Sequence, residues 1–278
     1  GTYYLEGTFV NKNPEMAVHH LQRVSPTNKL RQRANYLLGR CYLFGDGVLH
    51  NTKIAVKYFN ESPNVIKTAD VLYRLGMCYL QGTGGVSENT EKAVAYFKEA
   101  DQLGWVPAQF SLGLCYLSGN GVPKDETKAM ECFDNAKKNG YPTAIKAIEY
   151  FKTSDYPTAI YKLGIDHING INEIPQNLNN AVECLLCAMK LGYVVPVEQI
   201  YNLGLTNLQN SDEEKAILLF KVAAKAGYIE AKERIFNLGI IYLNKPGDIL
   251  EYEEKAIQYF TLAAELGYPE AIKTIFQL

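Results

Sequence analysis

The chain has 278 residues, of which 47% are hydrophobic and 21% are charged, so it is long enough to bury a substantial core. Its formal net charge of -2 argues against a nucleic-acid-binding surface, because such a surface needs a clustered basic face. The sequence contains no apolar run close to the roughly 18 residues of a membrane-spanning helix, and no signal-peptide pattern. We therefore expect neither a nucleic-acid partner nor insertion into a membrane.

Residues 1–33 are expected to form a truncated N-terminal repeat followed by a connection. The segment 4–7 is typical of the end of a helix, so we expect the natural N-terminus to precede residue 1. The segment 25–33 is polar and contains one proline, which is typical of a longer connection between helices.

Regular repeats are predicted from Ala34 onward, and six Leu-Gly pairs mark their first helices. The glycines are separated by 37, 37, 51, 40 and 35 residues, and periods of this length are typical of a helical solenoid. An aromatic residue stands two positions before each leucine. Because glycine costs about 1 kcal/mol in a helix interior, its recurrence predicts a close approach between helices. The pairs are Leu38-Gly39, Leu75-Gly76, Leu112-Gly113, Leu163-Gly164, Leu203-Gly204 and Leu238-Gly239.

The predicted second helix of each repeat carries an alanine followed four residues later by a large apolar residue, so both lie on one face. We expect the alanine to meet the glycine of the first helix, which would let the two helices pack closely. A glycine and an aromatic residue close most units, and glycine just past a helix end is the favoured left-handed cap. The pairs on the second helices are Ala55/Phe59, Ala93/Phe97, Ala129/Phe133, Ala181/Leu185, Ala216/Phe220 and Ala256/Phe260.

The 51-residue spacing marks an interruption of the regular alternation. The sequence Tyr-Pro-Thr-Ala-Ile begins at Tyr141 and again at Tyr156, and the segment 146–152 resembles a second helix. We predict a supernumerary helix or degenerate repeat over 144–158 that bends the superhelix. It would separate three regular repeats over 34–143 from three further repeats and a C-terminal half helix over 159–278.

Together these patterns resemble the Sel1-like repeat family, which is related to the tetratricopeptide repeats. The resemblance rests on A-x-x-x-L-G-x-x-Y, G-x-G-V, K-A-x-x-[YF]-[FL] and G-Y-x-x-A, which the segment 108–144 matches throughout. The last three repeats lose the G-x-G turn. The resemblance implies an all-α fold, a right-handed α-solenoid superhelix of antiparallel helix pairs. It also implies the family's usual role as an adaptor or scaffold in protein complexes, and many members are bacterial proteins that act in host interaction.

The patterns that could indicate chemistry have simpler structural explanations. The glycine-rich turns, such as Gly45-Asp-Gly47, follow a helix rather than a strand, so they predict turns and not phosphate-binding loops. Cys184-Leu-Leu-Cys187 lacks the second ligand pair that a zinc site needs, and His167 is the only nearby candidate. We therefore predict no catalytic residue, no metal site and no cofactor.

The six cysteines are expected to be reduced and buried. Cys41, Cys78 and Cys115 recur at one repeat position, and free cysteine is among the most buried residue types. A chain of this length does not need disulfides for stability. Reduced thiols favour a cytosol-like compartment, either that of the source cell or that of a host.

The candidate binding residues flank the repeat glycines on the first helices. By analogy with tetratricopeptide solenoids, whose first helices line the concave face, these side chains lie on or near that face. They would form a largely apolar groove for a partner helix or extended peptide segment, unless the aromatic residues only pack the units together. Arg40 stands among apolar equivalents, so we predict that it anchors an anionic group. The candidates are Tyr36, Arg40, Tyr73, Met77, Phe110, Leu114, Tyr161, Ile165, Tyr201, Leu205 and Phe236, and Ile240 is equivalent to Ile165.

The sequence thus favours a non-catalytic scaffold or adaptor that binds a partner protein, with a bacterial host-interaction protein as one form of it. Two alternatives stay open. One is an enzyme or small-ligand-binding protein with a site over 155–169, which would show a deep polar pocket with converging titratable groups. The other is a self-assembling structural module whose incomplete ends, 3–10 and 271–278, pair between molecules.

Overall fold

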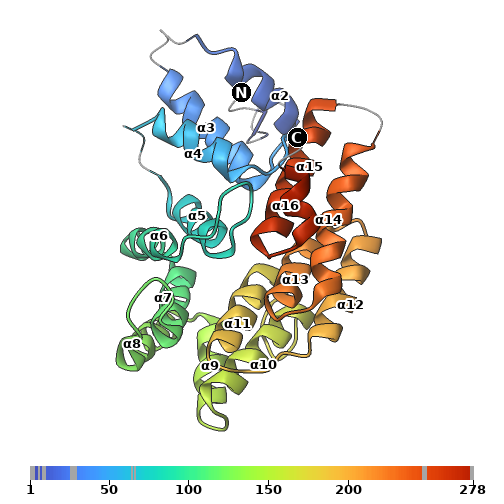
Figure 1. Cartoon of the computed structure of the whole chain (residues 1–278). Coiled ribbons are helices and arrows are strands. Elements are labelled where there is room, and N and C mark those ends of the chain that lie inside the picture. Colours follow the sequence, from blue (N-terminus) through green and yellow to red (C-terminus); the bar gives the residue numbers. More distant parts are fainter. Residues whose placement is uncertain are drawn as a thin grey trace. The chain divides into compact units, whose positions relative to one another are not determined.

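The chain folds into consecutive pairs of helices (Figure 1). The computed structural model describes residues 4–5, 7, 11–25, 30–63, 65, 67–245 and 249–275. These residues form fifteen helices and no strand, so the prediction of an all-α helical repeat solenoid is confirmed. The chain divides into two compact units, Gly1–Tyr141 (unit 1) and Pro142–Leu278 (unit 2).

Unit 1 contains one helix that precedes three complete helix pairs. The single helix is α2 (Pro14–Gln22). The pairs are α3 (Arg31–Phe44) with α4 (Thr52–Asn60), α5 (Ala69–Gln81) with α6 (Thr90–Gln102), and α7 (Val106–Ser118) with α8 (Glu126–Lys138).

Unit 2 begins with an additional helix, α9 (Pro142–Phe151). Three pairs follow, namely α10 (Tyr156–Asn169) with α11 (Leu178–Lys190), α12 (Val197–Gln209) with α13 (Glu213–Lys225), and α14 (Ile229–Leu243) with α15 (Ile249–Glu265). The short helix α16 (Pro269–Ile275) comes last.

Two predicted boundaries differ from the structure. The additional helix ends at Phe151, and α10 already begins at Tyr156, because Asp155 caps α10 by accepting a hydrogen bond from the Thr158 amide at 2.9 Å. The connection predicted over 25–33 is shorter, since α3 begins at Arg31; residues 26–29 lie outside the described part of the chain. The predicted bend of the superhelix stays a prediction.

Asparagine or aspartate caps the second helix of successive repeats at one repeat position. Each side chain accepts a hydrogen bond from the backbone amide three residues later, which satisfies one of the unpaired donors of the first turn. The distances range from 2.8 Å at Asn89 to 3.3 Å at Asp212. The caps are Asn13, Asn51, Asn89, Asp125, Asn177 and Asp212.

Five of the six repeat glycines face a phenylalanine ring of the second helix, whereas the sequence led us to expect the alanine there. A Cβ atom on Gly113 would lie 2.5 Å from Cε1 of Phe133, and one on Gly204 would lie 2.6 Å from Cε1 of Phe220. Gly39, Gly76 and Gly239 face a phenylalanine in the same way, whereas Gly164 faces Leu185 and the carbonyl oxygen of Ala181. The predicted close approach is therefore confirmed, but the residue that needs the space is the large member of the pair.

The glycine-rich turns of unit 1 stack each repeat on the preceding one. The second glycine of each turn has a positive φ, and a Cβ atom there would lie 2.3 Å from the first residue of the preceding second helix. The turns thus connect helices within a repeat and set the distance between neighbouring repeats. The contacts join Gly47 to Pro14, Gly84 to Thr52 and Gly121 to Thr90.

Candidate functional site

The eleven predicted binding residues divide into buried and half-buried side chains. Four of them, Tyr36, Met77, Phe110 and Leu114, are buried within unit 1 and expose 8% or less of their surface. The remaining seven are half-buried, and most of these lie in unit 2. They are Arg40, Tyr73, Tyr161, Ile165, Tyr201, Leu205 and Phe236.

Every predicted aromatic residue packs against rings of its own unit. Tyr201 contacts Phe220 of the second helix and Tyr228 of the closing turn, with ring centroids 5.4 and 5.1 Å apart. Phe236 contacts Phe260 and Tyr268 in the same arrangement, at 5.3 and 5.2 Å. This recurrence supports the packing interpretation, because aromatic pairs at such distances stabilise a core beyond the area they bury. The equivalent contacts are Tyr36 with Phe59, Tyr73 with Phe97 and Trp105, Phe110 with Phe133 and Tyr141, and Tyr161 with Tyr193.

Arg40 has an intramolecular partner that the sequence did not reveal. Its Nη2 atom lies 3.6 Å from Oδ2 of Asp70, the second residue of α5 in the next repeat. Its guanidinium also lies 5.9 Å from the ring centroid of Phe44. The side chain of Arg40 is 42% exposed, so this ion pair contributes little to stability, and binding of an external anion remains a prediction.

The first helices of unit 2 expose side-chain amides on both sides of an apolar row. On α12, spacings of three and four residues place Asn202, Leu205 and Gln209 on one face. Leu205 is half-buried, whereas the two amides are exposed. The same pattern occurs on α14 and, with lysine in place of the first amide, on α10. We call these equivalent positions of successive first helices the amide face, since the repeat register predicts that they lie on the same side of neighbouring repeats; it comprises Lys162, Ile165 and Asn169, then Asn202, Leu205 and Gln209, then Asn237, Ile240 and Asn244.

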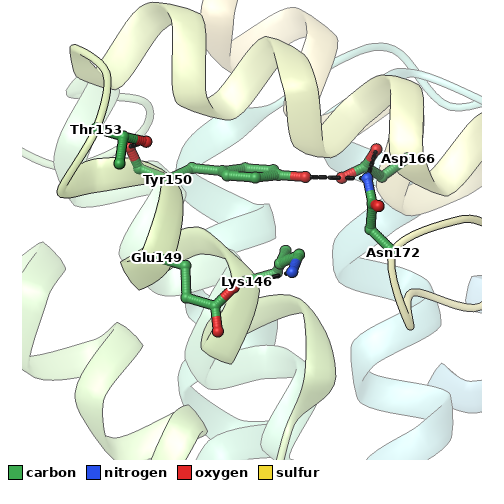
Figure 2. A network of polar contacts seen from close by, with 6 residues as sticks. All are labelled: Lys146, Glu149, Tyr150, Thr153, Asp166 and Asn172. Atoms are coloured by element: carbon green, nitrogen blue, oxygen red, sulfur yellow. Dashed lines mark hydrogen bonds and ion pairs between the residues drawn. The ribbon is translucent and has the colours of Figure 1, made fainter.

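A polar network joins α9 to α10 at the interruption between repeats (Figure 2). The Tyr150 hydroxyl donates to Oδ2 of the buried Asp166 at 2.6 Å. Asn172 donates from Nδ2 to Oδ1 of Asp166 at 2.9 Å and to the Tyr150 oxygen at 3.2 Å. Burial and the bond to Asp166 raise the pKa of Tyr150 to about 12. Tyr150 is therefore a hydrogen-bond donor at neutral pH, and its bond to Asp166 fixes α9 on α10.

His167 links the same two helices to the following loop. Nδ1 donates to the carbonyl oxygen of Pro175 at 3.2 Å, so Nε2 is left to accept from the Thr143 hydroxyl, 3.1 Å away. Burial lowers the pKa of His167, although the Pro175 carbonyl and Asp166 oppose that shift. The ring is thus neutral at pH 7 with both nitrogens engaged, which leaves it no free atom to act on a ligand.

The cysteines form no disulfide, and five of the six are buried. Burial raises the pKa of Cys41 and of Cys132 to about 11, and that of Cys184 well above its usual value. Protonated thiols are poor nucleophiles and poor metal ligands. The Cys184 side chain therefore acts as an apolar packing group in α11.

Comparison with known proteins identifies the repeats. A family model described as Sel1 repeat matches residues 1–23, 32–62, 69–104, 106–141, 157–193, 199–228 and 235–268. The chain belongs to the Sel1 repeat family. No Sel1 match covers the segment between residues 141 and 157, which holds α9, and this agrees with the interpretation of α9 as a helix outside the regular repeats. Sel1 repeat proteins are generally protein-interaction scaffolds.

Solved Sel1 structures are similar to this chain at low identity. A crystal structure of c5321, a protective antigen present in uropathogenic Escherichia coli strains displaying an SLR fold, is 22% identical, with a TM-score of 0.42. The match covers 97% of this chain and 61% of that one, so our chain spans less than two thirds of c5321. A Sel1 repeat protein from Oxalobacter formigenes is 23% identical over 99% of this chain and 73% of that one, with a TM-score of 0.37. No curated protein sequence matches the chain.

Within its described residues this Sel1 repeat protein holds no cluster of three or more His, Cys, Asp or Glu side chains that could bind a metal ion. In that same part of the chain, no helix is both long enough and apolar enough to cross a bilayer.

A second polar network, which the sequence analysis missed, joins the last three long helices. Glu213 of α13 accepts hydrogen bonds from the hydroxyls of Tyr242 (2.8 Å) and Tyr259, and it forms an ion pair with Lys255 at 2.7 Å. Burial alone would raise the pKa of Glu213, but the bonds from Lys255 and the two tyrosines outweigh it and lower that pKa. Glu213 is the residue after the Asp212 cap, and its partners are 29 to 46 residues away, so no local pattern indicated the network.

Proposed function

We propose that this Sel1 repeat protein is a non-catalytic scaffold that binds a segment of a partner protein across the first helices of its repeats. Membership of a family of interaction scaffolds carries this proposal. The amide face supports it, since the half-buried apolar row offers contact area and the exposed amides offer hydrogen bonds.

The repeat interruption does not support an enzyme site as well. Tyr150, Asp166 and Asn172 bond to one another, and both ring nitrogens of His167 bond to Thr143 and Pro175. These groups satisfy each other's hydrogen-bonding capacity instead of converging on a space for a substrate. The host-interaction role and the anchoring of an anion by Arg40 remain predictions.

Site-specific cross-linking tests the proposed binding surface without disturbing the core. The photoreactive residue p-benzoylphenylalanine would replace Thr206, which is exposed on α12 beside the amide face, or Glu253, which is exposed on the second helix α15. After irradiation in a lysate of the source cells, we expect a discrete cross-linked partner from position 206 and none from position 253. Cross-links from position 253 alone would move the binding surface to the second helices. An activity that follows the purified chain through repurification would contradict the non-catalytic part of the proposal.

A further inference from the structure

The amide face carries hydrogen-bonding groups that the fold itself does not use. Asn202, Gln209 and Asn237 are exposed, and within the part of the chain that the structure describes their side-chain amides make no hydrogen bond. Asn244 donates to the carbonyl oxygen of Ile240 at 2.9 Å, which leaves its amide oxygen available. Each amide can both donate and accept.

The pattern follows the repeat register and is confined to unit 2. In unit 1 the six equivalent positions lie two residues before and five residues after each repeat glycine. They hold a single amide, that of the buried Gln81, and three of the other side chains are serine or arginine. At the α10 end of the amide face, Lys162 is engaged, since Nζ donates to Oγ of Ser154 at 3.0 Å. The free amides are therefore concentrated on α12 and α14, on either side of Leu205 and Ile240.

The chemistry of these groups distinguishes two kinds of partner. A helix satisfies its backbone amides and carbonyls internally, so it would meet the amides of this face only with its own side chains. An extended segment presents unpaired backbone N–H and C=O groups to either side, and the side chains of an extended segment alternate between its two faces. Such a segment can pair its backbone with Asn202 and Asn237 while every second side chain packs on the apolar row.

We infer that the partner segment binds to the amide face of α12 and α14 as an extended chain with apolar residues at alternate positions, recognised through its backbone by Asn202 and Asn237. This inference rests on the proposed function and narrows it from any protein segment to one conformation and one pattern of side chains.

The first test uses linear random peptides displayed on phage and selected on the wild-type chain. The selected peptides are then measured by fluorescence polarisation against an Asn202→Ala/Asn237→Ala variant. An Asn135→Ala/Gln258→Ala variant is the matched control, because it removes two side-chain amides from the second helices α8 and α15, outside the face. Loss of two hydrogen bonds should weaken binding about tenfold or more, whereas the control should bind like the wild type. Circular dichroism confirms that both variants keep their helices.

The second test changes the peptide and leaves the protein intact. N-methylation of alternate backbone amides removes donors without altering side chains, so we expect it to weaken binding about as much as the double asparagine substitution does. A hydrocarbon-stapled helical version of the same peptide should bind far more weakly than the linear form.

The outcomes separate this inference from the proposed function. Peptides that cross-link to position 206 but tolerate N-methylation, bind equally to the asparagine variant, or bind better when stapled would overturn the extended conformation and leave the scaffold function in place. Selected peptides that never cross-link to position 206, together with no cellular partner there, would overturn both.

Discussion

Replacing Gly204 with alanine tests whether the repeat glycine is required to admit the ring of the second helix. The new Cβ atom would lie 2.6 Å from Cε1 and 2.7 Å from Cδ1 of Phe220. Phe220 is fully buried and packs against Tyr201, so its ring has little room to move away. Gly164 supplies a natural control in the same unit, because the atoms of Leu185 that face it would lie 3.1 Å from a Cβ atom.

Two opposing effects set the expected change in the free energy of unfolding of Gly204→Ala. Alanine improves helix propensity by about 1 kcal/mol over glycine. Overpacking of a rigid core costs about 1–3 kcal/mol, and two ring atoms closer than 3.0 Å place Gly204 in the upper part of that range. We therefore expect Gly204→Ala to lower the free energy of unfolding by about 1–2 kcal/mol. Gly164→Ala should change it by no more than about 0.5 kcal/mol, since the milder contact and the gain in propensity nearly cancel.

Urea unfolding followed by circular dichroism measures both variants, and hydrogen exchange in α12 and α13 localises the effect. A Gly204→Ala/Phe220→Leu variant places a leucine opposite the new alanine, as Leu185 would lie opposite an alanine at position 164. The two substitutions should therefore show a favourable coupling of about 1 kcal/mol in a double-mutant cycle. A Gly204→Ala protein that is more stable than the wild type by the full propensity gain, or a coupling of zero, would refute the steric explanation.

Three further substitutions test the polar contacts of the fold. Glu213→Gln should destabilise unit 2 by about 2 kcal/mol in urea unfolding, because it leaves the half-buried Lys255 charge without its carboxylate, and Lys255→Met in the same chain should recover most of the loss. The pKa of His167 is lower in the folded state than its usual 6.5, so the contribution of neutral His167 to stability is complete above pH 6.5 and declines as the pH falls through the folded pKa. The free energy of unfolding of the wild type, measured between pH 7.5 and 5, should show this decline. The His167→Asn variant should show a flatter pH dependence. Asn51→Ala removes the cap of α4 and should cost about 1 kcal/mol, with increased amide exchange limited to the first turn of that helix, and an unchanged exchange rate there would contradict the capping role.

The repeat architecture was predictable because it depends on spacings along the chain. Periodicity determines which residues share a helix face, and that is enough to find the pairs, the closing turns and the additional helix. It does not determine how two faces are rotated against each other. For this reason Ala216 and Phe220 were correctly placed on one face, but the wrong member of the pair was expected to meet Gly204.

The polar contacts were harder to predict from the sequence, because they join residues that are far apart in the chain or held in unusual backbone conformations. Arg40 and Asp70 belong to different repeats, so the arginine looked unexplained when its own repeat was considered alone. Asn172 reaches Asp166 only because the loop adopts positive φ at Asn172 and again at Glu173, and neither position is a glycine that would have signalled the turn.

The binding residues stay a prediction, but their burial could be read from the sequence only in part. Repeat position could not distinguish a side chain enclosed by rings from one at the surface. Leu114 and Leu205 each directly follow a repeat glycine, yet Leu114 is 2% exposed and Leu205 is half-buried. The amide face corresponds to an Asn or Gln that recurs at fixed distances from Gly204 and Gly239, a polar periodicity that apolar spacing does not reveal.

The stacked turns of unit 1 also constrain how this protein can evolve. At Gly47, Gly84 and Gly121 an added side chain would collide with the helix of the neighbouring repeat, so these positions cannot accept a bulkier residue without shifting that repeat. In unit 2 the turn after α12 has Ser211 at the left-handed position, and its side chain is exposed. We therefore expect insertions to be tolerated better in this exposed turn than at the packed glycines of unit 1.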